Sequence, residues 1–229
     1  MPLVDDFYLL AHDERGKTRL HARATAIGLA AGVLAELLLT GHIMVRDGNV
    51  LPAAPAPDWS TVDPQGVGRS RQPAPPPDPL GHTIWDQIWH EPNRHHIRTW
   101  LSGLAPTITE AVATRMVRVG TLDAVEVGRI RRTTRYVPAD SDAGTKVKVV
   151  LAARLVRQDT TLDWPDAVLC GLLVATGLIA DVLWQDTTGV GRRYLDHVLR
   201  GVAGQMPAFA DLFADTEAAV GDAVLAHRT

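Results

Sequence analysis

The fold is decided by the stretch LHARATAIGLAAGVLAELLLTGHI, residues 20–43. From residue 24 to residue 39, only Thr25 and Glu36 interrupt a run of apolar or small side chains. Apolar residues recur at helical spacing around almost the whole circumference, which is typical of a helix buried inside a protein. A membrane-spanning helix needs about 20 apolar residues, and this run is shorter and contains an acidic residue. We therefore predict a central core helix, ended by Gly41 and followed by a short strand.

The composition is that of a globular protein with one sizeable core. The 229 residues suffice for such a core, and contents of 46% hydrophobic and 21% charged residues are ordinary for a soluble protein. The net charge of −3 offers no general attraction to nucleic acid or to an anionic membrane, so binding to either would need a local patch. No nucleic-acid partner is expected. The single cysteine, Cys170, excludes an intrachain disulfide, and the first residues lack the basic start of a signal peptide. Both features predict a cytoplasmic protein.

Periodicity elsewhere predicts a mainly α fold, with a single compact multi-helix domain around the central helix and one or two small β-hairpins. One hairpin is expected around residues 47–49 and a second over residues 122–138. Residues 52–79 contain nine of the fifteen prolines and predict an irregular loop. Asn93 is a candidate N-cap. The other expected helices cover residues 2–11, 80–89, 94–104, 106–119, 143–157, 163–175, 178–184, 189–202 and 207–227.

Enzyme signatures are absent from the sequence, which contains no P-loop, no G-x-S-x-G and no dinucleotide-binding fingerprint. A histidine-rich segment does contain metal-ligand types, but Pro92 separates its two halves and no H-E-x-x-H spacing occurs. Its candidate ligands are His82, His90, Glu91, His95 and His96. We therefore predict surface or loop-packing histidines, no metal and no cofactor. A metal-assisted enzyme that uses residues 82–96 is the least favoured hypothesis.

Arginines crowd the second predicted hairpin. In extended chain Arg129, Arg131 and Arg135 share one face, and Arg132 joins them from the tip. Guanidinium forks suit phosphate oxygens, and each arginine near an anionic bilayer is worth about 1 kcal/mol. The alternative is a solvated edge strand that charge protects from aggregation. The complete candidate set for an anionic headgroup is Arg19, His21, Arg23, Arg115, Arg118, Arg129, Arg131, Arg132 and Arg135.

Several segments, taken in order, resemble the Golgi phosphoprotein 3 family, with the character of a bacterial, actinobacterial-type member. The pattern in the core helix consists of Gly28, Leu29, Gly32, Leu34, Glu36, Leu37, Leu39, Gly41 and Ile43. The N-terminal segment Leu3–Ala11, with Asp13 and Gly16, is similar to the opening of that family. Residues 112–122 are similar to the family's helix before its hairpin, and residues 169–179 to a late core helix. The likeness covers most of the chain.

The resemblance implies a peripheral adaptor with a mainly α-helical fold and a protruding β-hairpin. Such proteins bind phosphatidylinositol 4-phosphate and the cytosolic tails of glycosyltransferases. In eukaryotic members a tryptophan and three arginines form the headgroup pocket; the matching positions here hold His21, Ala30, Pro106 and Thr109. A charge-assisted hydrogen bond is worth about 1.5–3 kcal/mol, so loss of three arginines removes that specific pocket. The hairpin tip, residues 131–134, is polar, which favours attachment to a membrane surface over insertion.

The sequence thus leads to a non-enzymatic peripheral binder of anionic phospholipid headgroups, of the phosphoinositide type that the resemblance implies, or to a membrane adaptor. It would be cytoplasmic, at the inner face of a membrane. The alternative is a protein-interaction module without a lipid role, which forms a homo-oligomer through the hairpin.

Overall fold

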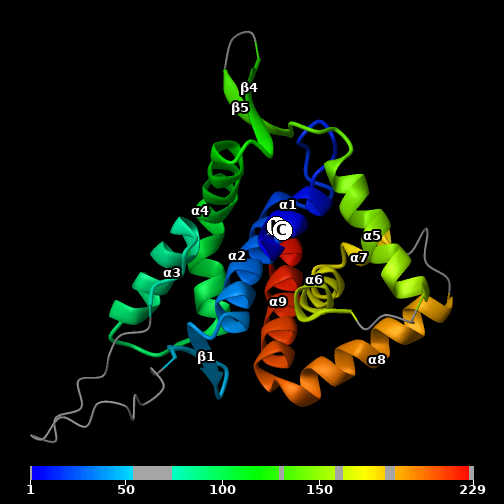
Figure 1. Cartoon of the computed structure of the whole chain (residues 1–229). Coiled ribbons are helices and arrows are strands. Elements are labelled where there is room, and N and C mark those ends of the chain that lie inside the picture. The colour runs from blue at the N-terminus through cyan, green and yellow to red at the C-terminus, as the bar shows by residue number, and fades with distance from the viewer. Residues whose placement is uncertain (1, 54–73, 129–131, 158–161, 184–188, 227–229) are drawn as a thin grey trace, which may run out of the picture.

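The computed structural model describes residues 2–53, 74–128, 132–157, 162–183 and 189–226, apart from the side chain of residue 190. This part of the chain folds into nine helices, a three-stranded sheet and a two-stranded sheet. The predicted mainly α fold with small hairpins is therefore confirmed. A continuous hydrophobic core draws residues from every helix between α1 and α9. Figure 1 shows the helices around α2, with the β4–β5 hairpin projecting from one end.

The central helix is α2, Ala22–Leu39, and it contacts α1, α3, α4, α6 and α9. Two glycines let α1, Leu3–Ala11, approach it closely. A Cβ on Gly28 would lie 2.4 Å from Cζ of Phe7, and one on Gly32 would lie 3.1 Å from Cγ2 of Val4. Helix α2 is also long and apolar enough to cross a membrane, but 78% of it is buried inside the protein. The expectation of a buried core helix is confirmed.

The predicted end of α2 and the first hairpin are also found. Gly41 has φ 70°, and the N–H groups of Gly41 and His42 donate to the carbonyls of Leu38 and Leu37, which closes the helix. Strands β1, Ile43–Arg46, and β2, Asn49–Pro52, then pair antiparallel. Positive φ values of 52° at Asp47 and 72° at Gly48 fit the two-residue turn between them.

A third strand and one long helix differ from the sequence-based expectation. Strand β3, His95–His96, pairs with β2, and His96 rather than Asn93 caps α4, Ile97–Arg118. We predicted two helices separated before Pro106, but α4 runs through this residue. Pro106 is exposed, whereas the buried face continues across it through Leu101, Leu104, Ile108 and Val112. Packing of that face offsets the roughly 3 kcal/mol that an internal proline costs.

The second predicted hairpin follows α4 and stands out from the helical body. Strands β4, Leu122–Val127, and β5, Thr133–Pro138, pair antiparallel. Thr133 and Thr134, which we expected at the tip, are paired in β5 with Val127 and Glu126. Residues 129–131 lie outside the described part of the chain, as does most of the proline-rich segment 52–79. The hairpin is thus confirmed, and its projection beyond α4 is visible in Figure 1.

The remaining helices complete the core. Helix α6 starts as predicted, since the Asp163 side chain accepts a hydrogen bond from the N–H of Asp166 at 3.0 Å. Within α6, Cys170 is fully buried, and burial raises the pKa of its thiol to about 12. The bounds are α3 Pro79–His90, α5 Ala143–Arg157, α6 Trp164–Ala175, α7 Ile179–Val182, α8 Gly189–Gln205 and α9 Pro207–Leu225.

Candidate functional site

The described arginines of the β4–β5 hairpin differ in their surroundings. Arg132 is exposed and forms an ion pair of 3.1 Å with Glu126, which is exposed as well. Arg135 pairs with Val125 across the ladder and is half-buried. Arg129 and Arg131 lie outside the described residues, so the common face predicted for them with Arg135 stays a prediction. Arg135 itself lies in a β-strand, and that prediction assumed an extended chain.

The loop between α1 and α2 packs against the base of this hairpin. A Cβ on Gly16 would lie 2.0 Å from the carbonyl oxygen of Tyr136 and 3.2 Å from Cγ of Arg135, so only glycine fits. Arg19, farther along the loop, is exposed, and its N–H donates to the carbonyl of Ala11. Exposed Arg118 ends α4 next to the hairpin. Two of the predicted additional arginines, Arg19 and Arg118, therefore belong to segments that meet the hairpin at its base.

Arg115 does not extend this surface. Its side chain is buried, pairs with Asp5 of α1, and lies 2.9 Å from Asp78 before α3. Glu36 of α2 joins the cluster and accepts the N–H of Val4 at 2.9 Å. The sequence-based assignment of Arg115 to headgroup binding is thus corrected: its guanidinium is held by carboxylates in the interior. Helical spacing placed Arg115 near the hairpin but gave no information on which side of α4 faces the core.

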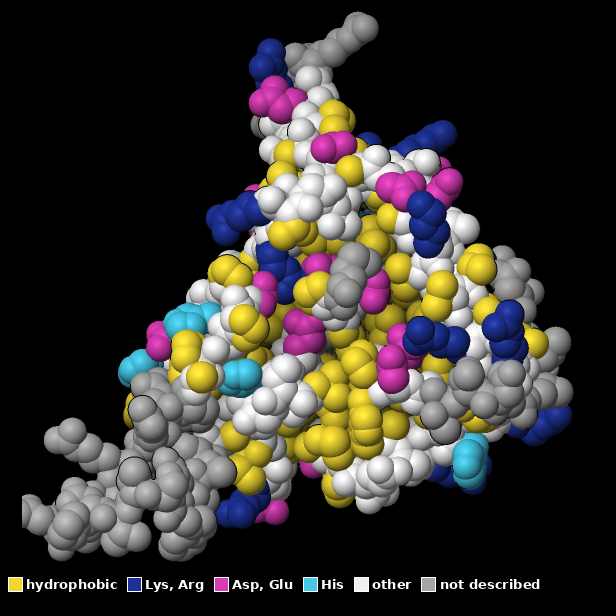
Figure 2. Space-filling model, in the orientation of Figure 1, with side chains coloured by type: hydrophobic (Ala, Val, Ile, Leu, Met, Phe, Trp, Pro, Cys, Tyr) yellow, Lys and Arg dark blue, Asp and Glu magenta, His cyan; other side chains and the backbone are white. Residues whose placement is uncertain are grey.

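The cluster around Arg115 has the electrostatics of a structural network. Burial raises the pKa of Asp5, although the charge of Arg115 opposes the rise. Burial likewise raises the pKa of Glu36 to about 7, against the hydrogen bond from Val4 and the charge of Arg115. Figure 2 shows acidic side chains gathered near the middle of this face of the molecule. The network joins α1, α2, α4 and the start of α3, and sequence reasoning missed it because its members are far apart in the chain.

A second arginine site lies at the other end of α4. A hollow of about 230 Å³ is formed by the first turns of α2 and α4 and the last turns of α9. Arg23 lines it from α2, Arg98 from α4 and Asp222 from α9, and Arg98 forms an ion pair with Asp222. The structure thus places Arg23 with Arg98, a residue that sequence reasoning missed, and assigns it to a different site from the hairpin.

The histidines of the segment 82–96 have separate partners. The side chain of His90 lies 3.2 Å from Asp86, that of His95 lies 3.3 Å from Glu91, and that of His96 lies 3.4 Å from Asp215. Among the described residues, no three histidine, cysteine or acidic side chains come together in a metal-binding arrangement. The hypothesis of a metal-assisted enzyme therefore has no ligand set in this part of the molecule.

The sequence model of the Golgi phosphoprotein 3 family matches residues 3–223. The chain belongs to the Golgi phosphoprotein 3 family. The match extends from α1 into the last turns of α9, and so includes the core helix, the hairpin and both arginines of the hollow. No curated protein matches the chain.

The four positions that the resemblance assigns to the headgroup pocket have different surroundings in this member of the Golgi phosphoprotein 3 family. Ala30 is fully buried in α2 and faces the core. His21 is exposed as the N-cap residue of α2, and Pro106 is exposed on α4 directly after Ala105, which lines the arginine hollow. Thr109 is half-buried one turn farther along. Two of these positions, His21 and Pro106, are therefore close in sequence to residues that line the hollow.

Proposed function

We propose that this protein is a non-enzymatic, peripheral binder of anionic phospholipid headgroups of the phosphoinositide type, attached to the cytoplasmic face of a membrane. Family membership supports the general role of a lipid-binding adaptor. The observation that carries the proposal is the β4–β5 hairpin, which projects beyond the helices and bears Arg132 and Arg135, with Arg118 at its base (Figure 1). A projecting element can reach a flat lipid surface that the concave parts of the body do not touch.

The chemistry of the hairpin suits phosphate groups at a membrane surface. The ion pair between Arg132 and Glu126 is exposed on both sides, and such pairs contribute only about 0.2–1 kcal/mol. Arg132 can therefore exchange the carboxylate for a lipid phosphate, with which an arginine forms two parallel hydrogen bonds. Val125 is 41% exposed on the same hairpin, where it follows Ala124, precedes Glu126 and pairs across the ladder with Arg135. This combination favours contact with headgroups over insertion into the acyl region.

The hollow of Arg23 and Arg98 is a separate candidate seat for one headgroup phosphate, at the opposite end of α4 from the hairpin. Two guanidinium groups line it from different helices, and each of them can donate two parallel hydrogen bonds to a phosphate. In the free protein Asp222 forms an ion pair with Arg98, so it competes with an anionic ligand for this arginine. Binding would then exchange the Arg98–Asp222 pair for an Arg98–phosphate pair.

Vesicle co-sedimentation tests the proposal. Vesicles of phosphatidylcholine alone are compared with vesicles that also contain phosphatidylserine or phosphatidylinositol 4-phosphate. The chain should sediment only with the anionic vesicles, and salt should weaken the binding because exposed charges are screened. At low salt, Arg118→Gln/Arg132→Gln should lower the affinity by about thirtyfold, since each arginine near the surface contributes about 1 kcal/mol.

The matched control is Arg46→Gln/Arg200→Gln, which removes the same charge from exposed positions on β1 and α8. Its affinity should stay within a factor of about two of wild type if binding is local to the hairpin. Equal losses in the two variants would show a nonspecific charge effect. Equal binding to neutral and anionic vesicles would refute a headgroup-binding role.

Self-association through the hairpin is the second candidate function. Each strand of the two-stranded β4–β5 sheet has only one neighbour in that sheet, and Val125 is exposed beside it. Such an edge can pair with a second copy or with an extended peptide of a partner, such as the cytosolic tail of a membrane enzyme. Light scattering after size-exclusion chromatography separates the cases, because a proline at Val125 should abolish a hairpin-mediated dimer and leave a monomer unaffected.

A further inference from the structure

The base of the β4–β5 hairpin is held from two sides. Tyr136 of β5 donates a hydrogen bond of 2.8 Å from its hydroxyl group to Oε1 of Glu110 on α4. Arg135, the preceding residue, points to the opposite face of the sheet, because side chains alternate along a strand. On that face, Cγ of Arg135 would lie 3.2 Å from a Cβ on Gly16, in the loop between α1 and α2. Strand β5 therefore lies between α4 and this loop.

The contact between Gly16 and β5 reaches the backbone of the strand. A Cβ on Gly16 would lie 2.0 Å from the carbonyl oxygen of Tyr136, so only a hydrogen atom fits there. Gly16 also has φ 71°, a value that glycine adopts without strain. Figure 1 shows the loop that follows α1 beside the base of the hairpin. Any side chain at residue 16 would therefore push the loop and the strand apart.

Hydrogen bonds within the loop hold Gly16 in place. The side chain of Asp13 accepts the backbone N–H groups of Arg15 and Lys17, at 2.9 and 2.8 Å. The N–H of Asp13 donates to the carbonyl of Lys17 at 2.8 Å, and the N–H of Gly16 donates to the carbonyl of Asp13 at 2.9 Å. These four bonds fix both sides of the turn. The loop can thus act as a firm support for β5.

The opposite support is formed by side chains of α4. Tyr136 is half-buried and packs against the hydrophobic core. The hydrogen bond to Glu110 raises the pKa of the Tyr136 hydroxyl group, and a hydrogen bond with the side chain of Thr114 opposes this rise. The hydroxyl group therefore keeps its proton at neutral pH and donates it to Glu110. Glu110 and Thr114, one turn apart on α4, together hold the end of the tyrosine ring.

We propose that Gly16, Tyr136 and Glu110 form a hairpin clamp, which positions the β4–β5 hairpin for binding to an anionic membrane surface. Arg132 lies four residues before Tyr136, or about 13 Å along an extended chain, so a small change of angle at the clamp is amplified at this arginine. A hairpin that is held at one angle presents Arg132 and Arg135 without having to be ordered when it binds. The inference rests on the proposed function of the hairpin.

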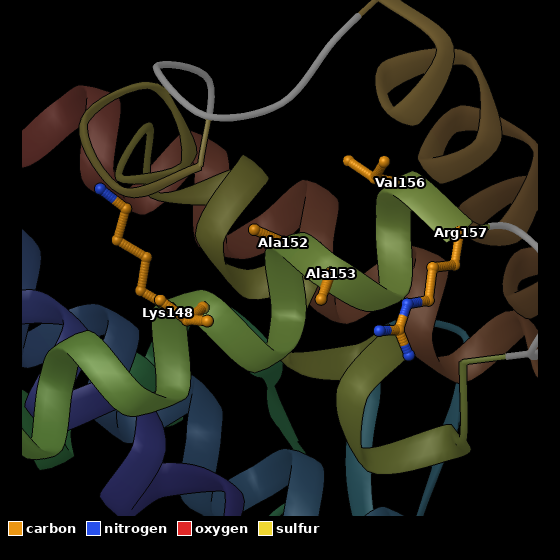
Figure 3. Close-up of a pocket in the computed structure, with 6 residues that line it drawn as sticks. Lys148, Ala152, Ala153, Val156 and Arg157 are labelled. Atoms are coloured by element: carbon orange, nitrogen blue, oxygen red, sulfur yellow. The ribbon is translucent and has the colours of Figure 1, made fainter.

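The distance between two spin labels tests the clamp in the absence of vesicles. Native Cys170 is fully buried, so labels react selectively at Thr134→Cys on the hairpin and Val156→Cys on α5. Thr134 is exposed, and Val156 lines a hollow on the surface of α5 with its side chain directed away from the helix (Figure 3). Double electron–electron resonance should give a single narrow distance distribution. A broad distribution in this background would show a mobile hairpin and overturn the inference.

Substitutions in the clamp should broaden this distribution. Gly16→Ala forces the loop away from β5, whereas Gly41→Ala is the matched control, because Gly41 has φ 70° and a Cβ there would meet nothing within 4 Å. Tyr136→Phe removes only the hydroxyl group and should broaden the distribution less. Glu110→Gln keeps an acceptor for that group and should leave the distribution narrow. Equal broadening by both alanines, or no broadening by Gly16→Ala and Tyr136→Phe, would overturn the inference.

Vesicle co-sedimentation separates a positioning role from a merely structural contact. On vesicles of phosphatidylcholine and phosphatidylserine, Gly16→Ala should lower the affinity about fivefold, since a mobile hairpin must be ordered on binding. The salt dependence should stay that of wild type, because no charge is removed. A broadened distribution with unchanged affinity would refute the positioning role and leave the proposed function intact. If the wild-type chain binds no anionic vesicle, the proposed function is refuted and the positioning role with it.

Discussion

Arg115 of α4 forms an ion pair with Asp5 of α1 in the protein interior, across 110 residues of sequence. The guanidinium also reaches Asp78 at 2.9 Å, so one buried cation holds the first helix and the start of α3 on α4. Removing one partner of a buried pair leaves an uncompensated charge, which costs about 3–5 kcal/mol. Arg115→Leu should therefore lower the free energy of unfolding in urea by an amount in this range.

A double-mutant cycle distinguishes this ion pair from a simple packing loss. Asp5→Asn in the Arg115→Leu background removes the uncompensated carboxylate and should recover part of the lost stability. The matched control is Arg118→Leu, one turn farther along α4, where the side chain is exposed and the effect should stay within about 0.5 kcal/mol of zero. Equal losses for both arginines would contradict the assignment of Arg115 to the interior.

Glu36 should make stability depend on pH. Burial raises its pKa from 4.5 to about 7, so the folded state binds a proton more tightly than the unfolded state. This group's contribution is then fully present below pH 4.5 and is lost as the pH rises toward 7. Glu36→Gln keeps an acceptor for the Val4 N–H and removes the titration. The variant should be more stable than wild type at pH 8 in urea unfolding, and the difference should vanish near pH 4.5.

The control for this pH dependence is Glu217→Gln on exposed α9 surface, which should leave the difference between pH 4.5 and pH 8 unchanged. A Glu36→Gln protein that loses stability in parallel with wild type as the pH rises would contradict the shifted pKa.

Local pattern was sufficient to predict most of the fold. The apolar run of α2, the glycine that ends it, the Asp47-Gly48 turn and the cap at Asp163 each act through neighbours in sequence, so each could be predicted. Pro106 was misjudged because a helix interior tolerates proline where the buried face on both sides is strong enough. Strand β3 has only two residues and forms because β2 lies beside it.

The candidate site was less accessible to sequence reasoning, because it depends on which side of a helix faces the core. Arg115 and Arg118 are three residues apart, yet one is buried between carboxylates and the other is exposed. The only local sign of the buried network was Glu36, an acidic residue inside an apolar run. No sequence pattern marked Arg98 as a site residue, because its proximity to Arg23 and Asp222 arises from the packing of three helices.

Close approach of α1 and α2 should depend on the absence of a side chain at residue 28. A methyl group there would meet Phe7, whose ring is fully buried and cannot move aside freely. Overpacking of this kind costs about 1–3 kcal/mol, so Gly28→Ala should lower the melting temperature. Phe7→Leu in the same background frees space and should make the alanine less harmful. An alanine at Gly201, where a Cβ would meet nothing within 4 Å, is the control and should be neutral or stabilising.

Asp222 and a phosphate would compete for Arg98. Substitution of Asp222 should therefore raise the affinity for vesicles, whereas most substitutions in a binding site lower it. Asp222→Asn frees Arg98 and removes a negative charge from the hollow, so binding to vesicles with phosphatidylinositol 4-phosphate should strengthen. Arg98→Gln should weaken it by about tenfold, the effect of losing one charge-assisted hydrogen bond. Both changes are read out by vesicle co-sedimentation. Asp211→Asn, on the exposed surface of the same helix, controls for net charge and should have a smaller effect than Asp222→Asn. If the two asparagine variants strengthen binding equally, the gain comes from overall charge and the hollow is not a headgroup seat.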